Sequence, residues 1–98
     1  MRMYERLKAL KEIADGVQKA LGTSVKDRYV TTFYKEGDGS GRVGVKVVFP
    51  EPKRNLPHYT DLKKVIEETG ADDVRPLYEY EAHVGRELWV GVELYWRE

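Results

Sequence analysis

The feature that most constrains the fold is a short motif that occurs twice. The chain reads Val-Gly-Val-Lys-Val-Val-Phe over 43–49 and Val-Gly-Val-Glu-Leu-Tyr-Trp over 90–96. Both copies alternate as in a β-strand with one buried face. The same offset aligns three further pairs: Arg28 with Arg75, Val30 with Leu77 and Phe33 with Tyr80. We interpret this as an internal repeat, because each half alone would leave a hydrophobic face uncovered.

Each half begins with a helical pattern. The first stripe comprises Met3, Leu7, Leu10, Ala14, Val17 and Leu21, and it predicts a helix over about 2–21 that is closed by Gly22. The second stripe comprises Leu62, Val65, Ile66 and Thr69, and Gly70 follows it. Thr60 is the predicted N-cap of this helix, and Asp61 suits its first turn because carboxylates are favoured at helix N-termini.

The remaining segments predict two β-hairpins. Strands are expected over 28–35, 42–49, 74–82 and 88–96. The fold class is therefore α+β, with an αββαββ internal repeat and a four-stranded antiparallel sheet that packs two helices on one face. One domain over 1–98 is expected, in which two αββ halves, about 1–49 and 58–98, are joined by a Pro-rich loop over 50–57.

Alternation also assigns the faces of the sheet. The face toward the helices takes Val43, Val45, Val47 and Phe49, together with Leu88, Val90, Val92, Leu94 and Trp96. The outward face takes Arg42, Gly44, Lys46 and Val48, together with Trp89, Gly91, Glu93 and Tyr95. The phase of the third strand stays open, because either Tyr78 and Tyr80 or Leu77 can point outward.

An outward face of this kind is more apolar than solvent requires, and aromatic side chains are favoured at recognition surfaces. The predicted partner-binding residues are Trp89, Tyr95, Tyr78, Tyr80 and Val48. The partner is another protein or a second copy of the chain, and the alternative interface is the stripe of the first helix. We expect the double substitution of Trp89 and Tyr95 by alanine to weaken the complex without unfolding the domain.

Single-stranded nucleic acid is the alternative partner. Aromatic residues on a sheet beside cations are suited to base stacking. The candidate cations are Arg28, Lys35, Arg42, Lys46, Lys53 and Arg54. Against this, carboxylates crowd the second hairpin, and 17 basic residues balance 17 acidic ones, so long-range attraction to a polyanion is absent.

The composition argues against catalysis by this chain. With no cysteine it has neither disulfides nor thiolate–zinc sites, and His58 and His83 lack metal-ligand spacing. No nucleophile motif is present, so we expect no catalytic residue, no metal and no cofactor. The charged start and the lack of a long apolar run predict a cytoplasmic protein without a membrane segment. One asparagine and one glutamine among many charges suggest a thermophilic source.

The αββαββ order resembles the core of LAGLIDADG homing endonucleases, and 13–16, Ile-Ala-Asp-Gly, resembles the acidic end of their signature helix. That resemblance implies a metal-dependent nuclease that uses Asp15. Here the apolar stripe continues past Asp15 to Leu21 and the family's final helices are missing, so we reject the assignment. The sequence instead predicts a non-enzymatic interaction module, and by analogy a regulator or an inhibitor of the type carried by phages and archaeal viruses.

Overall fold

The computed structural model describes residues 3–23, 30–35 and 42–96, with side-chain detail for 10–23, 30 and 44–96. The elements follow in the order α1 (Met3–Leu21), β1 (Val30–Lys35), β2 (Arg42–Lys53), α2 (Tyr59–Thr69), β3 (Asp73–Glu81) and β4 (Arg86–Trp96). The predicted α+β class with two helices and an antiparallel sheet is confirmed. Within the described residues, neither helix combines the length and the apolarity needed to cross a membrane.

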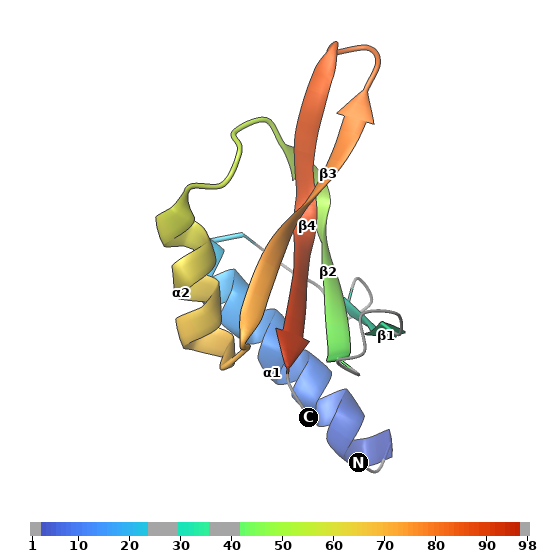
Figure 1. Cartoon of the computed structure of the whole chain (residues 1–98), viewed down its shortest axis with the longest axis vertical. Coiled ribbons are helices and arrows are strands. Elements are labelled where there is room, and N and C mark those ends of the chain that lie inside the picture. The colour runs from blue at the N-terminus through green and yellow to red at the C-terminus, as the bar shows by residue number, and fades with distance from the viewer. Residues whose placement is uncertain (1–2, 24–29, 36–41, 97–98) are drawn as a thin grey trace.

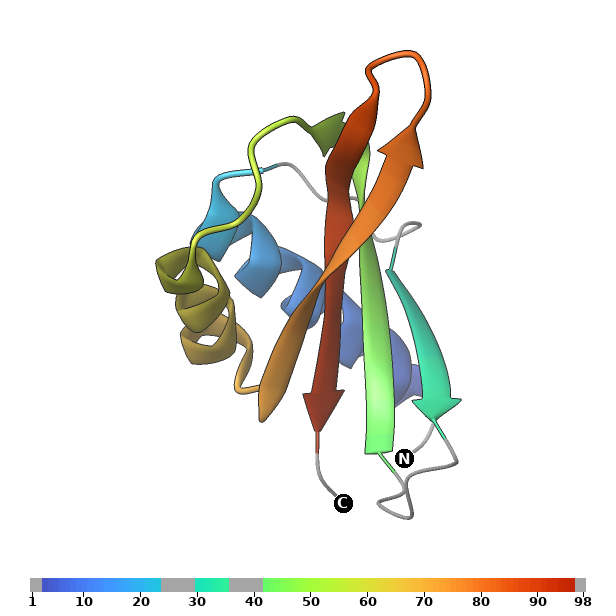
Figure 2. The ribbon, with the colours of Figure 1, turned by 45° about the horizontal axis from the view of Figure 1, so that its top comes forward.

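The strands lie in the order β1-β2-β4-β3, so the C-terminal strand β4 is central and β3 forms an edge. β4 pairs antiparallel with β2 on one side and with β3 on the other. Both helices lie on the same side of this sheet (Figures 1 and 2). β1 pairs with β2 at the other edge.

The core lies between the sheet and the helices. Its buried members include Ala14, Val17, Val45, Val47, Phe49, Val65, Val74, Val92 and Leu94. Of the stripe of α1, Ala14 and Val17 belong to this core and Leu10 and Leu21 pack against it, whereas the side chains of Met3 and Leu7 lie outside the described part. The helices approach closely at Gly16, where an added Cβ would lie 3.0 Å from the Glu68 carbonyl oxygen and from Thr69 Cγ2.

Both helices end at the predicted glycines. Gly22 and Gly70 have φ angles of 65° and 73°, which glycine adopts without a Cβ clash. The start of α2 differs from the prediction, because Thr60 lies inside the helix and His58 is the N-cap. The Asp61 carboxylate reaches back and accepts a hydrogen bond from the His58 N–H at 3.0 Å, so Asp61 satisfies the end of the helix without a threonine cap.

β2 does not end at Phe49 as predicted. It continues through both prolines to Lys53, so the loop expected over 50–57 begins at Arg54 instead. The pairing of β2 with β4 is interrupted between Val48 and Lys53. The prolines occupy this interruption, where a missing N–H removes no ladder hydrogen bond.

A second irregularity exchanges the two faces of β4 for the residues that precede Val90. Leu77 lies opposite Gly91 and Tyr78 lies opposite Trp89, which leaves Val90 as an extra residue without a partner on β3. Such a β-bulge shifts the alternation by one residue. Trp89 therefore belongs to the core cluster, and its predicted outward position is wrong.

The strand register also corrects the alignment of the two halves. Val30 lies opposite Val47 and Val74 lies opposite Leu94, and these two partners occupy the same place in the repeated motif. The pairs aligned in the sequence, Val30 with Leu77 and Phe33 with Tyr80, therefore do not share a strand register. The second hairpin is the longer one despite its shorter loop, because its strands are longer and β4 carries an extra residue at Val90.

Candidate functional site

The structure divides the five predicted partner-binding residues between two surfaces and the core. Tyr95 and Val48 point away from the helices, whereas Tyr78 and Tyr80 share the helix-side face with Val74, because they follow it at alternate positions of β3. Trp89 and Tyr95 are only 4% and 2% exposed. The predicted single aromatic face is therefore wrong, and two separate surfaces have to be considered.

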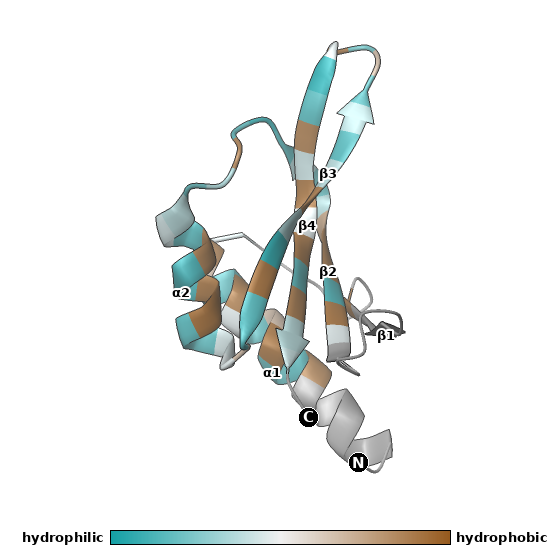
Figure 3. Cartoon of the chain, viewed as in Figure 1, coloured by the Kyte–Doolittle hydropathy of each residue, from teal (hydrophilic) through white to brown (hydrophobic). Residues whose placement is uncertain are grey.

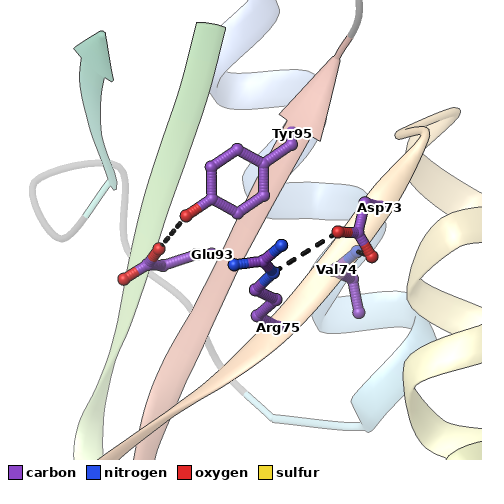
Figure 4. Close-up of polar contacts among 5 residues, drawn as sticks. All are labelled: Asp73, Val74, Arg75, Glu93 and Tyr95. Atoms are coloured by element: carbon purple, nitrogen blue, oxygen red, sulfur yellow. Dashed lines mark hydrogen bonds and ion pairs between the residues drawn. The ribbon is translucent and has the colours of Figure 1, made fainter. Parts of the chain in front are cut away.

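The polar and aromatic side chains of the outward face contact one another. Tyr95 donates a hydrogen bond to the Glu93 carboxylate, and the Arg75 guanidinium lies 5.3 Å from the centroid of the Tyr95 ring. Arg75 Nε also lies 3.4 Å from the Asp73 carboxylate (Figure 4). The charged and aromatic groups of this face thus bind one another within the chain.

Two neighbouring rows complete this surface. Exposed Lys46 lies opposite Glu93, a cross-strand pair of opposite charge. In the next row, half-buried Val48 and Leu77 flank Gly91 on β4. The backbone that approaches this glycine is that of β2, because an added Cβ would lie 3.1 Å from Val48 Cα. The glycine therefore serves strand packing, and not the approach of an external group.

The Tyr95 hydroxyl is held in its protonated form. Burial raises its pKa most, and the hydrogen bond to the Glu93 carboxylate and the repulsion by that charge add to the effect, to about 12. The nearby Arg75 acts in the opposite direction. With its pKa this high, the phenol stays protonated and acts as a hydrogen-bond donor to Glu93 near neutral pH.

Trp89 is an anchor of the core. Its ring meets Phe49 edge to face, with 5.1 Å between the centroids and 83° between the planes. The Lys53 ammonium lies 5.6 Å from both ring centroids, and the indole N–H donates to the Gly91 carbonyl at 2.7 Å. Sequence reasoning missed Lys53 in this role, because the β2 interruption that brings it beside the rings leaves no periodic signal.

The exposed large hydrophobic side chains lie on the loop before α2, on α2 and on the β3–β4 hairpin. The described large hydrophobic residues that are exposed are Leu56, Tyr59, Tyr78, Tyr80 and Val84. The β3–β4 hairpin projects beyond both helices, and its end carries mostly hydrophilic residues (Figures 1 and 3). Tyr78 and Tyr80 belong to this hairpin on its helix-side face, and they are 44% and 65% exposed.

We call residues 78–88 the arm. Its turn is closed by hydrogen bonds from the amides of Val84 and Gly85 to the Glu81 carbonyl, and Gly85 has a φ of 73°. At its base Trp89 is buried opposite Tyr78. The Arg86 guanidinium donates to the Arg54 carbonyl, which connects the arm to the loop before α2.

The predicted nucleic-acid residues do not form one described patch. Arg28 and the side chains of Lys35 and Arg42 lie outside the described part of the chain. Lys46 is on the outward face opposite Glu93, whereas Lys53 is half-buried over the two core rings on the other face. Arg54 is exposed in the loop.

Groups suited to metal binding are dispersed. Among the residues that the structure describes, no three His, Asp or Glu side chains are arranged to hold a metal ion. Asp15 is exposed on α1, where it lines a shallow depression together with Gln18 and Lys19. His58 is the N-cap of α2, and His83 lies in the β3–β4 turn. Asp15 therefore has no carboxylate cluster around it in the described structure.

Comparisons of the chain with protein-family models, with curated proteins and with solved structures found no match. The functional argument therefore rests on the surfaces described above.

Proposed function

We propose that this chain is a non-enzymatic interaction module that docks a protein partner through the arm. The observation that carries the proposal is the exposure of Tyr78 and Tyr80 at a hairpin end that projects beyond the helices. Tyrosine gives a large contact area at a small cost in rotamer entropy, and it is enriched in the centres of interfaces. Exposed Val84 at the turn extends the same surface.

A protein partner fits this surface better than nucleic acid. The tyrosines stand among the carboxylates Glu79, Glu81 and Glu87, which repel phosphate. Of the candidate cations that the structure describes, Lys46 and Lys53 lie on opposite faces of the sheet. A role as regulator or inhibitor suits such a module, because it acts by occupying a surface of its target.

The test begins with capture of a partner and ends with a reconstituted pair. The full chain is used as bait, and a protein that it retains is produced and titrated by calorimetry with the full chain and with the variant Tyr78→Ser/Tyr80→Ser. We expect the double variant to bind at least about tenfold more weakly, because each tyrosine is of interface hot-spot type.

Tyr59→Ser is the matched control, since Tyr59 is 80% exposed but lies on α2 outside the arm. It should bind as the unsubstituted chain does. Equal binding by the arm variant, with an unchanged circular dichroism spectrum, would contradict docking through the arm.

We also propose that the two αββ halves with their four strands are copies of one unit. In an antiparallel sheet, two copies related by a two-fold axis pair equivalent residues at that axis. Lys46 and Glu93, the central residues of the two motifs, are direct partners. On either side, Gly44 faces Tyr95 and Gly91 faces Val48, which are equivalent pairs. On this view the arm is the second unit's hairpin, adapted for binding.

A further inference from the structure

We infer that the surface which the arm binds is a positively charged protein surface, rich in lysine or arginine. This inference rests on the proposed docking role of the arm and adds the chemistry of the partner. It comes from a separation of charge along the chain, from the positions of the carboxylates, and from the way in which the single arginine of the arm is used.

The charge separation is plain from the sequence. The whole chain has a formal net charge of zero. Residues 78–88 contain the acidic Glu79, Glu81 and Glu87 but one basic residue, Arg86. Arg86 donates to the Arg54 carbonyl at the base of the arm, so its side chain is directed toward the molecule's own loop. The projecting end is therefore acidic on a chain that is neutral as a whole.

The carboxylates lie on both faces of the arm. Glu87 is directly opposite Tyr80, so a carboxylate and an exposed phenol share the helix-side face. Glu79 is opposite Leu88 on the outward face. Glu81 is used within the turn, because its carboxylate accepts the His83 amide at 3.2 Å.

Among the described residues, Glu79 and Glu87 have no hydrogen-bond partner of the kind that Glu81 has. Both are exposed. The ion pairs found among the described residues, Lys19–Glu68 and Arg75–Asp73, involve neither of them. On the helix-side face, Glu87 and the two tyrosines thus offer lysine and arginine side chains both an ion-pair partner and ring faces, and Glu79 adds a second carboxylate on the reverse side of the same hairpin. Complementary charge of this kind steers encounter and selects the partner.

The same charges argue against two other occupants. A second copy of the chain that docked arm against arm would bring like charges together, and a nucleic acid would place phosphates against carboxylates. Both remain measurable outcomes of the experiment below.

The experiment uses the full chain labelled with ¹⁵N and four probes. These are a dodecapeptide of alternating arginine and glycine, its lysine counterpart, a glutamate–glycine peptide of the same length, and a single-stranded oligothymidylate. We expect saturable binding of the basic peptides at low salt, with amide shifts confined to residues 78–88. The affinity should fall as salt rises, because ion pairs contribute to it.

The variant Glu79→Gln/Glu87→Gln should bind the basic peptides about twofold to thirtyfold more weakly, as expected for the loss of two exposed ion pairs. Its control is Glu12→Gln/Glu67→Gln, which makes the same change in net charge at exposed positions on the two helices. The control should keep most of the affinity. Equal losses in the two variants would reduce the effect to net charge and overturn the inference.

Three further outcomes would also overturn it: no binding of either basic peptide at low salt, tighter binding of the oligothymidylate, or concentration-dependent self-association that masks the arm. These failures are separable from failure of the proposed function. If Tyr78→Ser/Tyr80→Ser abolishes binding to the reconstituted partner while Glu79→Gln/Glu87→Gln leaves it intact, the arm docks a partner that is not basic. If both variants bind that partner normally, arm docking itself is wrong.

Discussion

Replacement of Gly91 by alanine gives the sharpest test of the packing of β4. Gly91 is buried between β2 and β3, and its φ is not positive, so its backbone conformation suits alanine. Strand propensity alone predicts that Gly91→Ala stabilises the domain by about 0.5–1 kcal/mol. The structure predicts the opposite sign. The new Cβ would lie closer than 3.0 Å to the Val47 carbonyl oxygen and 3.1 Å from Val47 C, both backbone atoms of the adjacent strand.

Relief of that clash requires β2 to move away from β4. Overpacking of this kind costs about 1–3 kcal/mol. For a domain of this size, 1 kcal/mol corresponds to about 4–8 °C in Tm, so a cost near 2 kcal/mol lowers Tm by about 8–16 °C. Chemical denaturation and calorimetry measure both quantities. Hydrogen exchange should also show faster exchange at the amides of Val47 and Val48.

Gly70→Ala is the matched control. Gly70 has a φ of 73°, and an added Cβ meets nothing within 4 Å, so its cost is conformational and about 1 kcal/mol. Exchange of the β2 amides should be unchanged in this variant. A Gly91→Ala protein that is as stable as the unsubstituted chain would refute the close approach of β2 to Gly91.

Three further predictions concern single side chains. Trp89→Ala should destabilise the domain by about 3–5 kcal/mol in chemical denaturation, because it empties a core site, so the Trp89/Tyr95 double alanine variant expected to remain folded should unfold instead. Tyr95 should ionise last in an ultraviolet titration of the tyrosines. Since its folded pKa is raised to about 12 from 10.0, the stability that it contributes is complete below pH 10 and is lost as the pH rises toward 12; Tyr95→Phe should remove this part of the alkaline dependence. Asp61→Ala should cost about 1 kcal/mol in thermal unfolding by removing the carboxylate that accepts the His58 N–H, whereas Asp61→Asn should cost less.

Much of the fold followed from periodicity. The described part of the α1 stripe, the terminal glycines of both helices, and the inward positions of Val45, Val47, Val92 and Leu94 are found where the sequence predicts them. These features depend on local rules, namely the helical repeat, the strand repeat and the tolerance of glycine for positive φ.

The site was predicted less well, because two interruptions of the strands have no signature in the sequence. The bulge at Val90 moves Trp89 from the outward face to the core, and the interruption after Val48 brings Lys53 beside Phe49 and Trp89. Tyr78 and Tyr80 were selected as binding residues, but their face could not be assigned. Leu56, Tyr59 and Val84 were missed, because an isolated exposed residue belongs to no periodic pattern.

The contact between Arg86 and the Arg54 carbonyl has a consequence for the thermodynamics of association. A hairpin that moved freely would have to be immobilised by its partner, and that loss of conformational entropy would weaken binding. Here Arg86, which follows the turn directly, holds the hairpin to the Arg54 carbonyl, and buried Trp89 fixes the base of the hairpin. The tyrosines are thus presented on a preorganised element. On the proposal that the arm docks a partner, Arg86→Ala would loosen this support and raise the dissociation constant.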